Sequence, residues 1–585
     1  MLAVIGVAAV TAILPAASSR AGVASHRVSP ALGGFSATPM VSAPQQQKST
    51  IPTFDCQSYP LDGSLGPRCY TPQQIQQAYG YSGLLASGVN GKGETIVIVD
   101  AFSNPYLAKD LKIQDATFKL PDPNFKVVAP QGVPAFDINN GDMDNWAVEM
   151  TLDVLWAHAM APGASIVLVE AKSDQDSDML AATKWAVDNN AGDVISQSFG
   201  EAETCADSSF LAQEHAVFQE AVNKGITLFA SSGDSGAAQY NCDGSAAILS
   251  VGSPASDPLV TSVGGTTLDA SNPAGNYLGE TAWTEPYLCN PPDADDVNCS
   301  GGGYSTLYSV PDFQQGVVAA GSGRGVPDVS YNAGLNGGVL IHSGLVNLFY
   351  GYAPNDPTVF FTIGGTSAGS PQWAALAADA GQLAGHPLGD INPTLYALAS
   401  RPATYAADFH DITVGSNTVA DLGGEGYDTG TGWDAVTGLG TPNAANLLPA
   451  LAAGCVSGTV TGDLTVGSGQ TLCLLPGAHV THDLVVQKGG TLIDEGATID
   501  HDLHADGAAS VSVTGGSVGH DLVVQNSTGG VTITGVTVGH DLNVLNNAGP
   551  TVISGNSAAH DANCQKNGGQ TGSGNGSGHS NSCPI

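Results

Sequence analysis

Residues 95–102 read TIVIVDAF, an apolar run interrupted only by Asp100 near its end. A strand that is apolar on both sides is typical of a parallel sheet covered by helices on both faces. Between Tyr70 and Pro449 such runs alternate with helical segments, so the sequence predicts an α/β domain there. The other predicted strands are 165-SIVLVEA-171, 193-DVISQSFG-200, 226-ITLFASSG-233 and 248-ILSVGS-253.

A helix is predicted over residues 146–160, WAVEMTLDVLWAHAM, and Pro162 with the glycine after it is a normal stop for it. This helix carries Glu149 and Asp153, which are four residues apart and therefore share one face. His158 lies five residues beyond Asp153, off that face. Taken alone, two carboxylates on one helix face indicate a solvated surface, so the pair gains meaning only beside other motifs.

The sequence changes character after residue 454. A His-Asp-Leu tripeptide recurs at intervals of 19, 19 and 20 residues, and a related His-Asp-Ala follows after 20 more. Short Val, Thr and Ile runs between glycine turns at this spacing predict an all-β solenoid with one coil per repeat. A structural repeat is the favoured interpretation of the histidines, a metal-binding ladder is the alternative, and the rings are expected at a corner or inside. The repeats begin at His482, His501, His520, His540 and His560.

The length of 585 residues predicts more than one domain. With 16 Lys and Arg against 53 Asp and Glu, the net charge of −37 excludes nucleic acid as a natural partner and suits a protein that works in acid. The predicted segments are a signal peptide (1–24), a linker or short pro-region (25–69), a peptidase-like domain (70–452), a solenoid (453–569) and a low-complexity, mobile tail (570–585) that Cys583 ties back.

An apolar run followed by small residues at the N-terminus predicts secretion, and no later stretch is long enough to span a membrane. Ten cysteines, an even number, suit an oxidising compartment. No CxxC spacing indicates zinc, and pairing between sequence neighbours is expected. The expected disulfides are Cys56–Cys69, Cys205–Cys242, Cys289–Cys299, Cys455–Cys473 and Cys564–Cys583.

Ser367 stands in 362-TIGGTSAGSPQWAALAADAG-381, between small residues and before an Ala-rich helical run, as a nucleophile at a helix start would. The surrounding G-x-S-x-G pattern also matches the nucleophile turn of α/β-hydrolases, which would take His386 or His410 as the base. A Gly-Asp-Ser-Gly around Ser235 resembles the chymotrypsin nucleophile, but that family is all-β. A third template is subtilisin-like, with Asp100 in the first position of the triad and Glu149 and Asp153 on the helix where a histidine is usual.

Four motifs in this order resemble one family, the sedolisins, which are serine-carboxyl peptidases with a subtilisin-like fold. The resemblance covers about residues 70–450 and implies a subtilisin-like parallel sheet flanked by helices. Three of the motifs are Glu149-Met-Thr-Leu-Asp153, Ser231-Ser-Gly-Asp234 and Gly365-Thr-Ser367-Ala-x-x-Pro371. By this resemblance Ser367 is the nucleophile, Glu149 the general base, Asp153 its partner, and Asp234 part of the oxyanion site.

Physical chemistry agrees with these roles. A second carboxylate beside Glu149 raises one pKa of the pair, so that the two groups share a proton. Asp234 can donate a hydrogen bond to an oxyanion only while it is protonated, which requires an acidic working pH. Asp100 is expected either to extend this proton network or to be an ordinary residue at a strand end. Phe199 stands where some family members have Trp, which shortens the network.

The fourth motif is a pair of loops, 408-DFHDITVGSN-417 and 428-DTGTGWDAVTGLGTPN-443. Carboxylate and carbonyl oxygens are the ligands that Ca²⁺ prefers. The resemblance implies one structural Ca²⁺ held by Asp411, Asp434 and the carbonyls of Ile412, Gly430 and Gly432.

The hypothesis is therefore a secreted, monomeric, acid-acting serine peptidase whose substrates are proteins or peptides. Two alternatives remain, a catalytically inactive secreted binding protein and an esterase that uses Ser367 with a histidine. Whether cleavage is internal or removes N-terminal tripeptides, and what the solenoid does, stay open.

Overall fold

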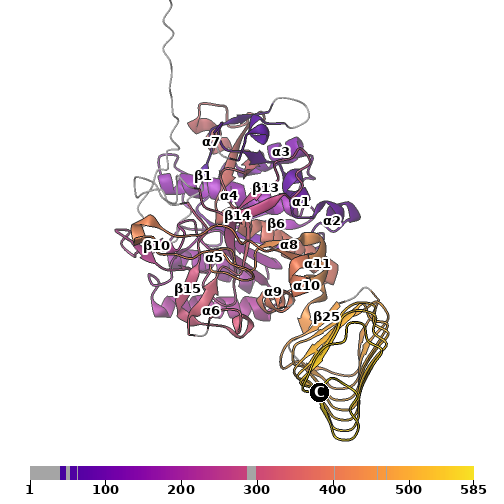
Figure 1. The fold of residues 1–585 in the computed structure, drawn as a ribbon. Coiled ribbons are helices and arrows are strands. Elements are labelled where there is room, and N and C mark those ends of the chain that lie inside the picture. The colour runs from indigo at the N-terminus through magenta and orange to yellow at the C-terminus, as the bar shows by residue number, and fades with distance from the viewer. Residues whose placement is uncertain are drawn as a thin grey trace, which may run out of the picture.

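The computed structural model describes residues 40–47, 53–61, 64–285, 298–319, 321–400, 402–456, 459–468 and 471–585. The chain forms an α/β body followed by a C-terminal module of stacked coils (Figure 1). The predicted signal peptide, residues 1–24, lies outside the described residues. Among the helices that are described, none has both the length and the apolar character needed to cross a membrane.

A parallel sheet forms the centre of the body, as predicted. Its order is β14-β13-β9-β7-β4-β6-β5, with β17 also beside β13, and every pair is parallel except β13 with β14. The strands are β4 (Thr95–Ala101), β5 (Asn124–Val128), β6 (Ser165–Ala171), β7 (Val194–Gln197), β9 (Thr227–Ser231), β13 (Thr261–Asp269), β14 (Gly279–Ala282) and β17 (Val329–Asn332).

Helices cover both faces of this sheet because successive side chains of a strand point to opposite sides. On β4, Ile96 and Ile98 join the apolar core of α4 (Gly141–Met160) and α8 (Gly369–Ala384). Val97 and Val99 join the core of α5 (Asp176–Asp188) and α6 (Ser208–Asn223) on the other face. The remaining helices are α1 (Pro72–Ala78), α2 (Ser82–Ser87), α3 (Leu107–Phe118), α7 (Gly344–Phe349), α9 (Asn392–Ala399), α10 (Pro402–Asp408) and α11 (Ala444–Ala453).

Two sequence expectations need correction. The segment 248–253 does not enter the parallel sheet: β11 (Ala247–Leu249) and β12 (Gly252–Ser253) make antiparallel pairs with β10 (Ala238–Tyr240) and β8 (Glu201–Ala202). The central position beside β9 is taken by β13, whose backbone pairs on both edges. Helix α4 begins five residues before the predicted start, because the Asn140 side chain caps it by accepting from the N–H groups of Asp142 and Met143.

Part of the predicted linker is packed on the body. β1 (Met40–Val41) and β2 (Gln45–Gln46) pair antiparallel with β19 (Val359–Gly364), the strand that leads to Ser367. On its other side β19 pairs with β18 (Gly338–Ile341), and β3 (Cys69–Tyr70) completes that sheet. Both edges of the strand before the candidate nucleophile are thus hydrogen-bonded.

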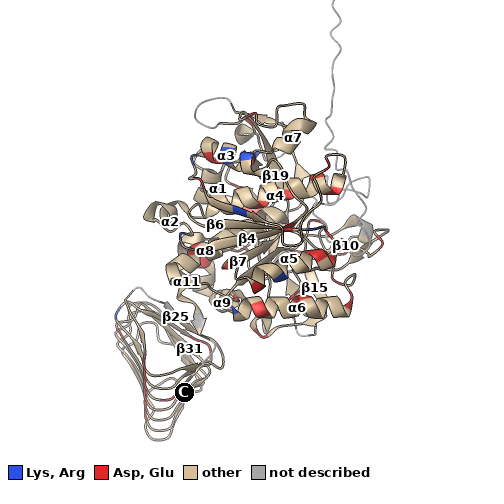
Figure 2. Ribbon diagram, turned by 180° about the vertical axis from the view of Figure 1, so that it is seen from behind, with Lys and Arg blue, Asp and Glu red and all other residues tan. Residues whose placement is uncertain are grey.

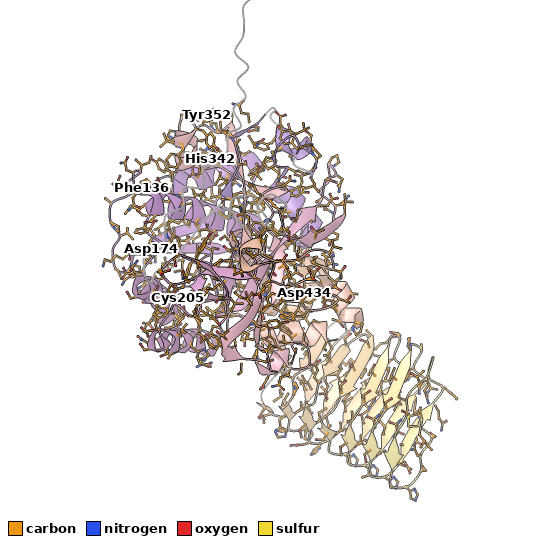
Figure 3. The ribbon with its side chains drawn as sticks, turned by 60° about the vertical axis from the view of Figure 1, so that its left-hand side comes forward. Phe136, Asp174, Cys205, His342, Tyr352 and Asp434 are labelled. Carbon is orange, nitrogen blue, oxygen red and sulfur yellow. A yellow bond between two sulfur atoms is a disulfide. The ribbon has the colours of Figure 1, made fainter. Side chains whose placement is uncertain are left out.

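Three parallel sheets build the C-terminal module, and each strand pairs with the equivalent strand one repeat along (Figure 3). The register follows the repeat, since Leu503 pairs with Leu522 and Leu522 with Leu542. One sheet holds β24 (Leu464–Val466), β27 (Leu484–Val486), β30 (Leu503–Asp506), β33 (Leu522–Gln525), β36 (Leu542–Leu545) and β39 (Ala562–Gln565). A second holds β22 (Cys455–Val456), β25 (Thr471–Leu474), β28 (Thr491–Asp494), β31 (Ser510–Thr514), β34 (Val531–Thr534) and β37 (Thr551–Ser554).

The third sheet of the module includes the end of the chain, and this corrects the predicted tail. Its strands are β23 (Thr459–Val460), β26 (His479–Val480), β29 (Thr498–Ile499), β32 (Ser517–Val518), β35 (Thr537–Val538), β38 (Ser557–Ala558) and β40 (Gly576–Ser577). Residues 570–585 are therefore a further coil. Buried Asn575 donates to the carbonyls of Ile553 and Pro584, so a side chain ties this Gly- and Ser-rich segment to the coil before it.

The disulfides that the structure describes follow the expected neighbour pairing. They are Cys56–Cys69, Cys205–Cys242 and Cys564–Cys583. Cys299 and Cys473 are also disulfide-bonded. The expected partners of these two cysteines, Cys289 and the side chain of Cys455, lie outside the described residues.

Candidate active site

Ser367 lies in a short 3-10 turn, η3 (Thr366–Ala368), between β19 and α8. Its two neighbours in the turn are buried, whereas Ser367 is partly exposed. Gly365 enters the turn at φ +115°, and a Cβ there would lie 2.7 Å from Oδ2 of Asp234. Only glycine combines this backbone angle with so close an approach, so Gly365 is what allows Asp234 to lie beside the turn.

Asp234 follows β9 and is docked onto Thr366. Its Oδ1 accepts hydrogen bonds from the Thr366 amide at 2.8 Å and from the Thr366 hydroxyl at 2.7 Å. The Thr366 hydroxyl in turn accepts from the amide of Gly233 at 3.1 Å. Desolvation raises the pKa of Asp234 and the two Thr366 bonds partly offset the rise, so the carboxyl keeps its proton to a higher pH than an exposed aspartate.

Figure 2 shows helix α4 beside strand β4. Helix α4 carries Glu149 and Asp153 into the core, and Asp100 reaches the same region from the end of β4. All three carboxyl groups are 0% exposed. Among the described residues none of them forms a salt bridge or a hydrogen bond of standard geometry. Three buried carboxyl groups without a cation cannot all be ionised, because each isolated charge would be very costly in the interior.

Electrostatic coupling links the three groups to one another. Burial first, and the carboxylate of Asp153 second, raise the pKa of Glu149 well above its ordinary value. Burial and then Asp100 do the same to the pKa of Asp153, and burial and then Glu149 raise the pKa of Asp100. Glu149 is also in contact with the Ser367 hydroxyl, which partly offsets the rise in its pKa. The coupled carboxyl groups therefore reach Ser367 through Glu149.

The histidines of the body are engaged elsewhere. In the described part of the chain, none of them hydrogen-bonds the Ser367 hydroxyl. Four of them have a hydrogen-bond partner at 2.8 Å: the Pro121 carbonyl for His158, Asp257 for His215, Asp110 for His342 and the Pro387 carbonyl for His386. The ring of His410 stacks on Tyr277, with ring centres 3.8 Å apart. The G-x-S-x-G alternative, which needed His386 or His410, has no base in this arrangement, and the α/β sheet makes the all-β alternative around Ser235 wrong.

Two residues near the site had no role assigned from the sequence. Thr366 stood inside the Gly-Thr-Ser motif, but only the fold shows that it holds Asp234. Ser198 follows β7 and contacts Asp153, which partly offsets the rise in the pKa of that carboxyl, and its Oγ lies 3.4 Å from the Ser367 carbonyl oxygen. Phe199, next to it, packs against Trp146 of α4 at 6.0 Å between ring centres. Its aromatic ring cannot join a proton network.

The candidate cation loops also meet. The Gly432 amide donates to both carboxylate oxygens of Asp411 at 3.2 Å, and the Gly430 amide donates to Asp434 at 3.0 Å. Among the described residues, the carbonyl oxygens of Ile412, Gly430 and Gly432 accept no hydrogen bond. Figure 3 shows Asp434 in the α/β body. Two carboxylates and unused carbonyls form an oxygen-only donor set, which fits a hard cation such as Ca²⁺.

Comparison with known proteins agrees with this geometry. Residues 136–395 match the model of the Subtilase family. Kumamolisin of Bacillus sp. (strain MN-32) is 34% identical over 397 residues, 66% of this chain and 64% of kumamolisin. Sedolisin of Pseudomonas sp. (strain 101) is 34% identical over 308 residues, 51% of this chain and 48% of sedolisin. The chain thus spans less than two thirds of the length of these curated relatives.

A solved structure gives the same result in three dimensions. Pseudomonas sedolisin, a serine-carboxyl proteinase complexed with two molecules of pseudo-iodotyrostatin, superposes with a TM-score of 0.55 at 28% identity, over 65% of this chain and 97% of that one. The resemblance that the sequence motifs indicated is confirmed: this chain is similar to the sedolisins in sequence and in fold.

Proposed function

We propose that this protein is a serine-carboxyl peptidase that cleaves peptide bonds in acid through an acyl-enzyme on Ser367. The observation that carries the proposal is the cluster of buried carboxyl groups, Asp100, Asp153 and Glu149. Glu149 of this cluster contacts the Ser367 hydroxyl, while the histidines of the body have other partners. An elevated carboxyl pKa brings Glu149 closer to the basicity that a general base for a hydroxyl needs.

The reaction follows from these positions. Glu149 takes the proton of the Ser367 hydroxyl as Oγ attacks the carbonyl carbon of the substrate. The same proton then passes to the leaving amine as the peptide bond breaks and an ester remains on Ser367. Water, deprotonated by Glu149, attacks that ester, and the proton returns to Oγ. Asp153 and Asp100 hold Glu149 in place and share its protons, as Asp does for His in the ordinary triad.

Asp234 supplies the oxyanion site in this proposal. Its Oδ1 is occupied by Thr366, which leaves a protonated Oδ2 free to donate to the developing negative oxygen. An ionised Asp234 would repel that oxygen, so activity is lost when the pH rises above its pKa. The raised pKa of Asp234 widens the acidic range over which it can donate.

One Ca²⁺ ion held by Asp411, Asp434 and the carbonyls of Ile412, Gly430 and Gly432 belongs to the proposal as a structural element. The ion would link two loop segments that are already adjacent, and it supplies charge compensation rather than a reaction step.

The rest of the proposal concerns the whole protein. Residues 455–585 would be a β-solenoid appended to the enzyme, and the disulfides suit a secreted protein. The enzyme would act as a monomer, and its substrates would be proteins or peptides.

The test is hydrolysis of a denatured protein at pH 4 and at pH 8 by the wild type and by Ser367→Ala. Acid-only hydrolysis that the variant lacks supports the proposal. Hydrolysis only at pH 8 would favour the esterase alternative, and none at either pH would favour the inactive binding protein. Mass spectrometry of the products distinguishes internal cleavage from removal of N-terminal tripeptides.

A further inference from the structure

Six histidine rings form one line along a corner of the C-terminal module, and we call this set the histidine ladder. Its members are His482, His501, His520, His540, His560 and His579. The centres of neighbouring rings lie 4.4 Å apart for the first pair and 4.9, 4.9 and 5.0 Å apart for the pairs from His520 to His579. These spacings match the separation of paired strands, about 4.8 Å, so the ladder repeats once per coil.

The rings stand outside the apolar core of the module. Their side chains are 43–73% exposed, whereas Leu484 and Leu503, two residues after a ladder histidine, are fully buried. The expectation that placed the histidines at a corner is confirmed, and the alternative that placed them inside is wrong. Any ion in solution can therefore reach the ladder.

A carboxylate lies between successive rings. Asp521 places Oδ1 2.7 Å from Nδ1 of His540 and Oδ2 3.6 Å from Nδ1 of His520. Its Oδ1 also accepts from the backbone N–H of Asp541 at 2.9 Å, which holds the carboxylate in this position. Each such carboxylate thus faces one nitrogen from its own coil and one from the next.

The same arrangement recurs along the ladder. Asp561 lies 3.6 Å from Nδ1 of His560 and 3.2 Å from Nδ1 of His579. Asp483 lies 3.9 Å from Nδ1 of His482 and 3.8 Å from Nδ1 of His501. In four groups of two histidines and one aspartate, one ligand atom from each residue lies within 4.8 Å of the others.

The distances from ring nitrogen to carboxylate oxygen, 2.7–3.9 Å, are close to those of ligands around a common ion. Bonds of about 2.0–2.1 Å from a metal to nitrogen and oxygen place neighbouring ligand atoms roughly 3–4 Å apart. A histidine–aspartate hydrogen bond alone needs one ring per carboxylate, as for Asp502 with His520. Two ring nitrogens converge on Asp483, Asp521 and Asp561. Two imidazoles and a carboxylate suit Zn²⁺, Co²⁺, Ni²⁺ or Cu²⁺, in contrast to the oxygen-only loops around Asp411 and Asp434.

We propose that the histidine ladder is a binding site for divalent transition-metal ions of the zinc class, and that it holds three of them in a row. Three is the largest number because each ion uses Nδ1 of two rings and six rings make three pairs. The pairs are His482 with His501, His520 with His540, and His560 with His579, around Asp483, Asp521 and Asp561. The site rests on the module alone and not on the proposed peptidase activity.

The test uses the full-length protein at pH 7.5 with Ca²⁺ in the buffer, so that the oxygen-only loops do not compete. Protons compete with metal for imidazole, which is why the pH is kept above neutral. Equilibrium dialysis against ZnCl₂ with elemental analysis should give three tightly bound ions per chain. With CoCl₂, the visible absorption spectrum of the bound ion should be stronger than that of the hydrated ion. The stronger absorption would indicate nitrogen ligands in a coordination shell of low symmetry.

Variants locate the ions. His520→Gln with His540→Gln should lower the count from three to two, and Asp521→Asn should weaken one ion at least tenfold while its oxygen still accepts from the Asp541 N–H. His504→Gln is the matched control, since His504 is an exposed histidine of β30 outside the ladder. The proposal is overturned if the wild type binds no zinc tightly. It is also overturned if the double variant binds as many zinc ions as the wild type, or if His504→Gln loses as many as the double variant. Circular dichroism shows whether each variant is folded, and if the double variant is not, undiminished zinc affinity in Asp521→Asn overturns the proposal instead.

Discussion

Asp234 and Thr366 are joined by two hydrogen bonds, from the Thr366 amide at 2.8 Å and the Thr366 hydroxyl at 2.7 Å to the same carboxylate oxygen. Thr366 directly precedes Ser367, so these bonds connect a loop after β9 to the turn before α8. Because one oxygen is occupied, the geometry leaves the other for a substrate. Asp234 is therefore positioned by the fold before any substrate binds.

Asp234→Ala should lose about 3 kcal/mol of transition-state stabilisation, the usual scale for one oxyanion donor. Asp234→Asn should keep part of the activity, because its carbonyl can accept both Thr366 bonds and its amide can donate at any pH. The profile of kcat/KM against pH should therefore extend towards neutral pH in the Asn variant. Equal losses in both variants with an unshifted profile would contradict an oxyanion role.

Single replacement of Ser367, Glu149 or Asp153 by Ala should each lower kcat by orders of magnitude on a peptide substrate at pH 4. A double variant of Ser367 and Glu149 should lose little more than either single variant, since members of one catalytic unit are not additive. His386→Gln is the control, because His386 is exposed and bonded to the Pro387 carbonyl. A folded Glu149→Ala protein that stays active would contradict the mechanism.

Removal of Ca²⁺ with a chelator should lower the melting temperature of the α/β body. An ion bound only by the native state stabilises it by RT ln(1 + [L]/Kd), where [L] is the free ion concentration. Asp434→Asn should melt like the chelated wild type and should not respond to chelator. Asp428→Asn, an exposed acid in the same loop, is the matched control. Identical melting temperatures with excess Ca²⁺ and with chelator would exclude the site.

Stability should fall as pH rises, and Glu214 of α6 offers a way to measure this. Burial is the main cause that raises the pKa of Glu214 from 4.5 to about 8, and Ser253 donates to it at 2.6 Å. Between these pH values the folded state holds a proton that the unfolded state has released, so the free energy of unfolding decreases as pH increases. Stability from this group is complete below about pH 4.5 and is lost as pH rises towards 8.

Glu214→Gln cannot lose a proton, so its stability should match the wild type near pH 4 and exceed it at pH 8 by on the order of 4 kcal/mol. Urea unfolding at the two pH values measures the difference. Glu220→Gln, at a partly exposed position of the same helix, is the control for the Glu-to-Gln change itself. A Glu214→Gln protein with the pH slope of the wild type would contradict the assignment.

Deletion of residues 455–585 should leave kcat on a short peptide nearly unchanged, because the candidate catalytic residues all lie before residue 370. It should lower the melting temperature of the body, since Ile493 belongs to the same apolar cluster as Leu447 and Leu451 of α11, and Glu495 accepts from Ser400 at 2.8 Å. Ile493→Ala in the full chain should reproduce part of that loss. Ile553→Ala, in a distant coil, is the control for Ile493→Ala. A truncated protein that is folded but has lost kcat would show that the module shapes the active site.

The sequence alone determined the alternation of strands and helices, the repeat of 19 or 20 residues and the motifs around Glu149, Asp234 and Ser367. These features are local, because apolar periodicity and turn residues act over a few positions of the chain. The same local signals misplaced segment 248–253, which is apolar enough for a central strand. They also indicated a mobile tail at residues 570–585, where the structure has a further coil. Asn575 and the expected Cys564–Cys583 disulfide tie this coil to the one before it.

Only the tertiary structure decided which residues meet. Asp100, Asp153 and Glu149 come from two elements and acquire raised pKa values because the fold buries them together without a cation. The closeness of Asp234 and Thr366 depends on the glycine at position 365, and the line of histidines depends on coils that place equivalent residues one strand spacing apart. Desolvation and long-range packing are properties of the folded chain as a whole, so no short stretch of sequence encodes them.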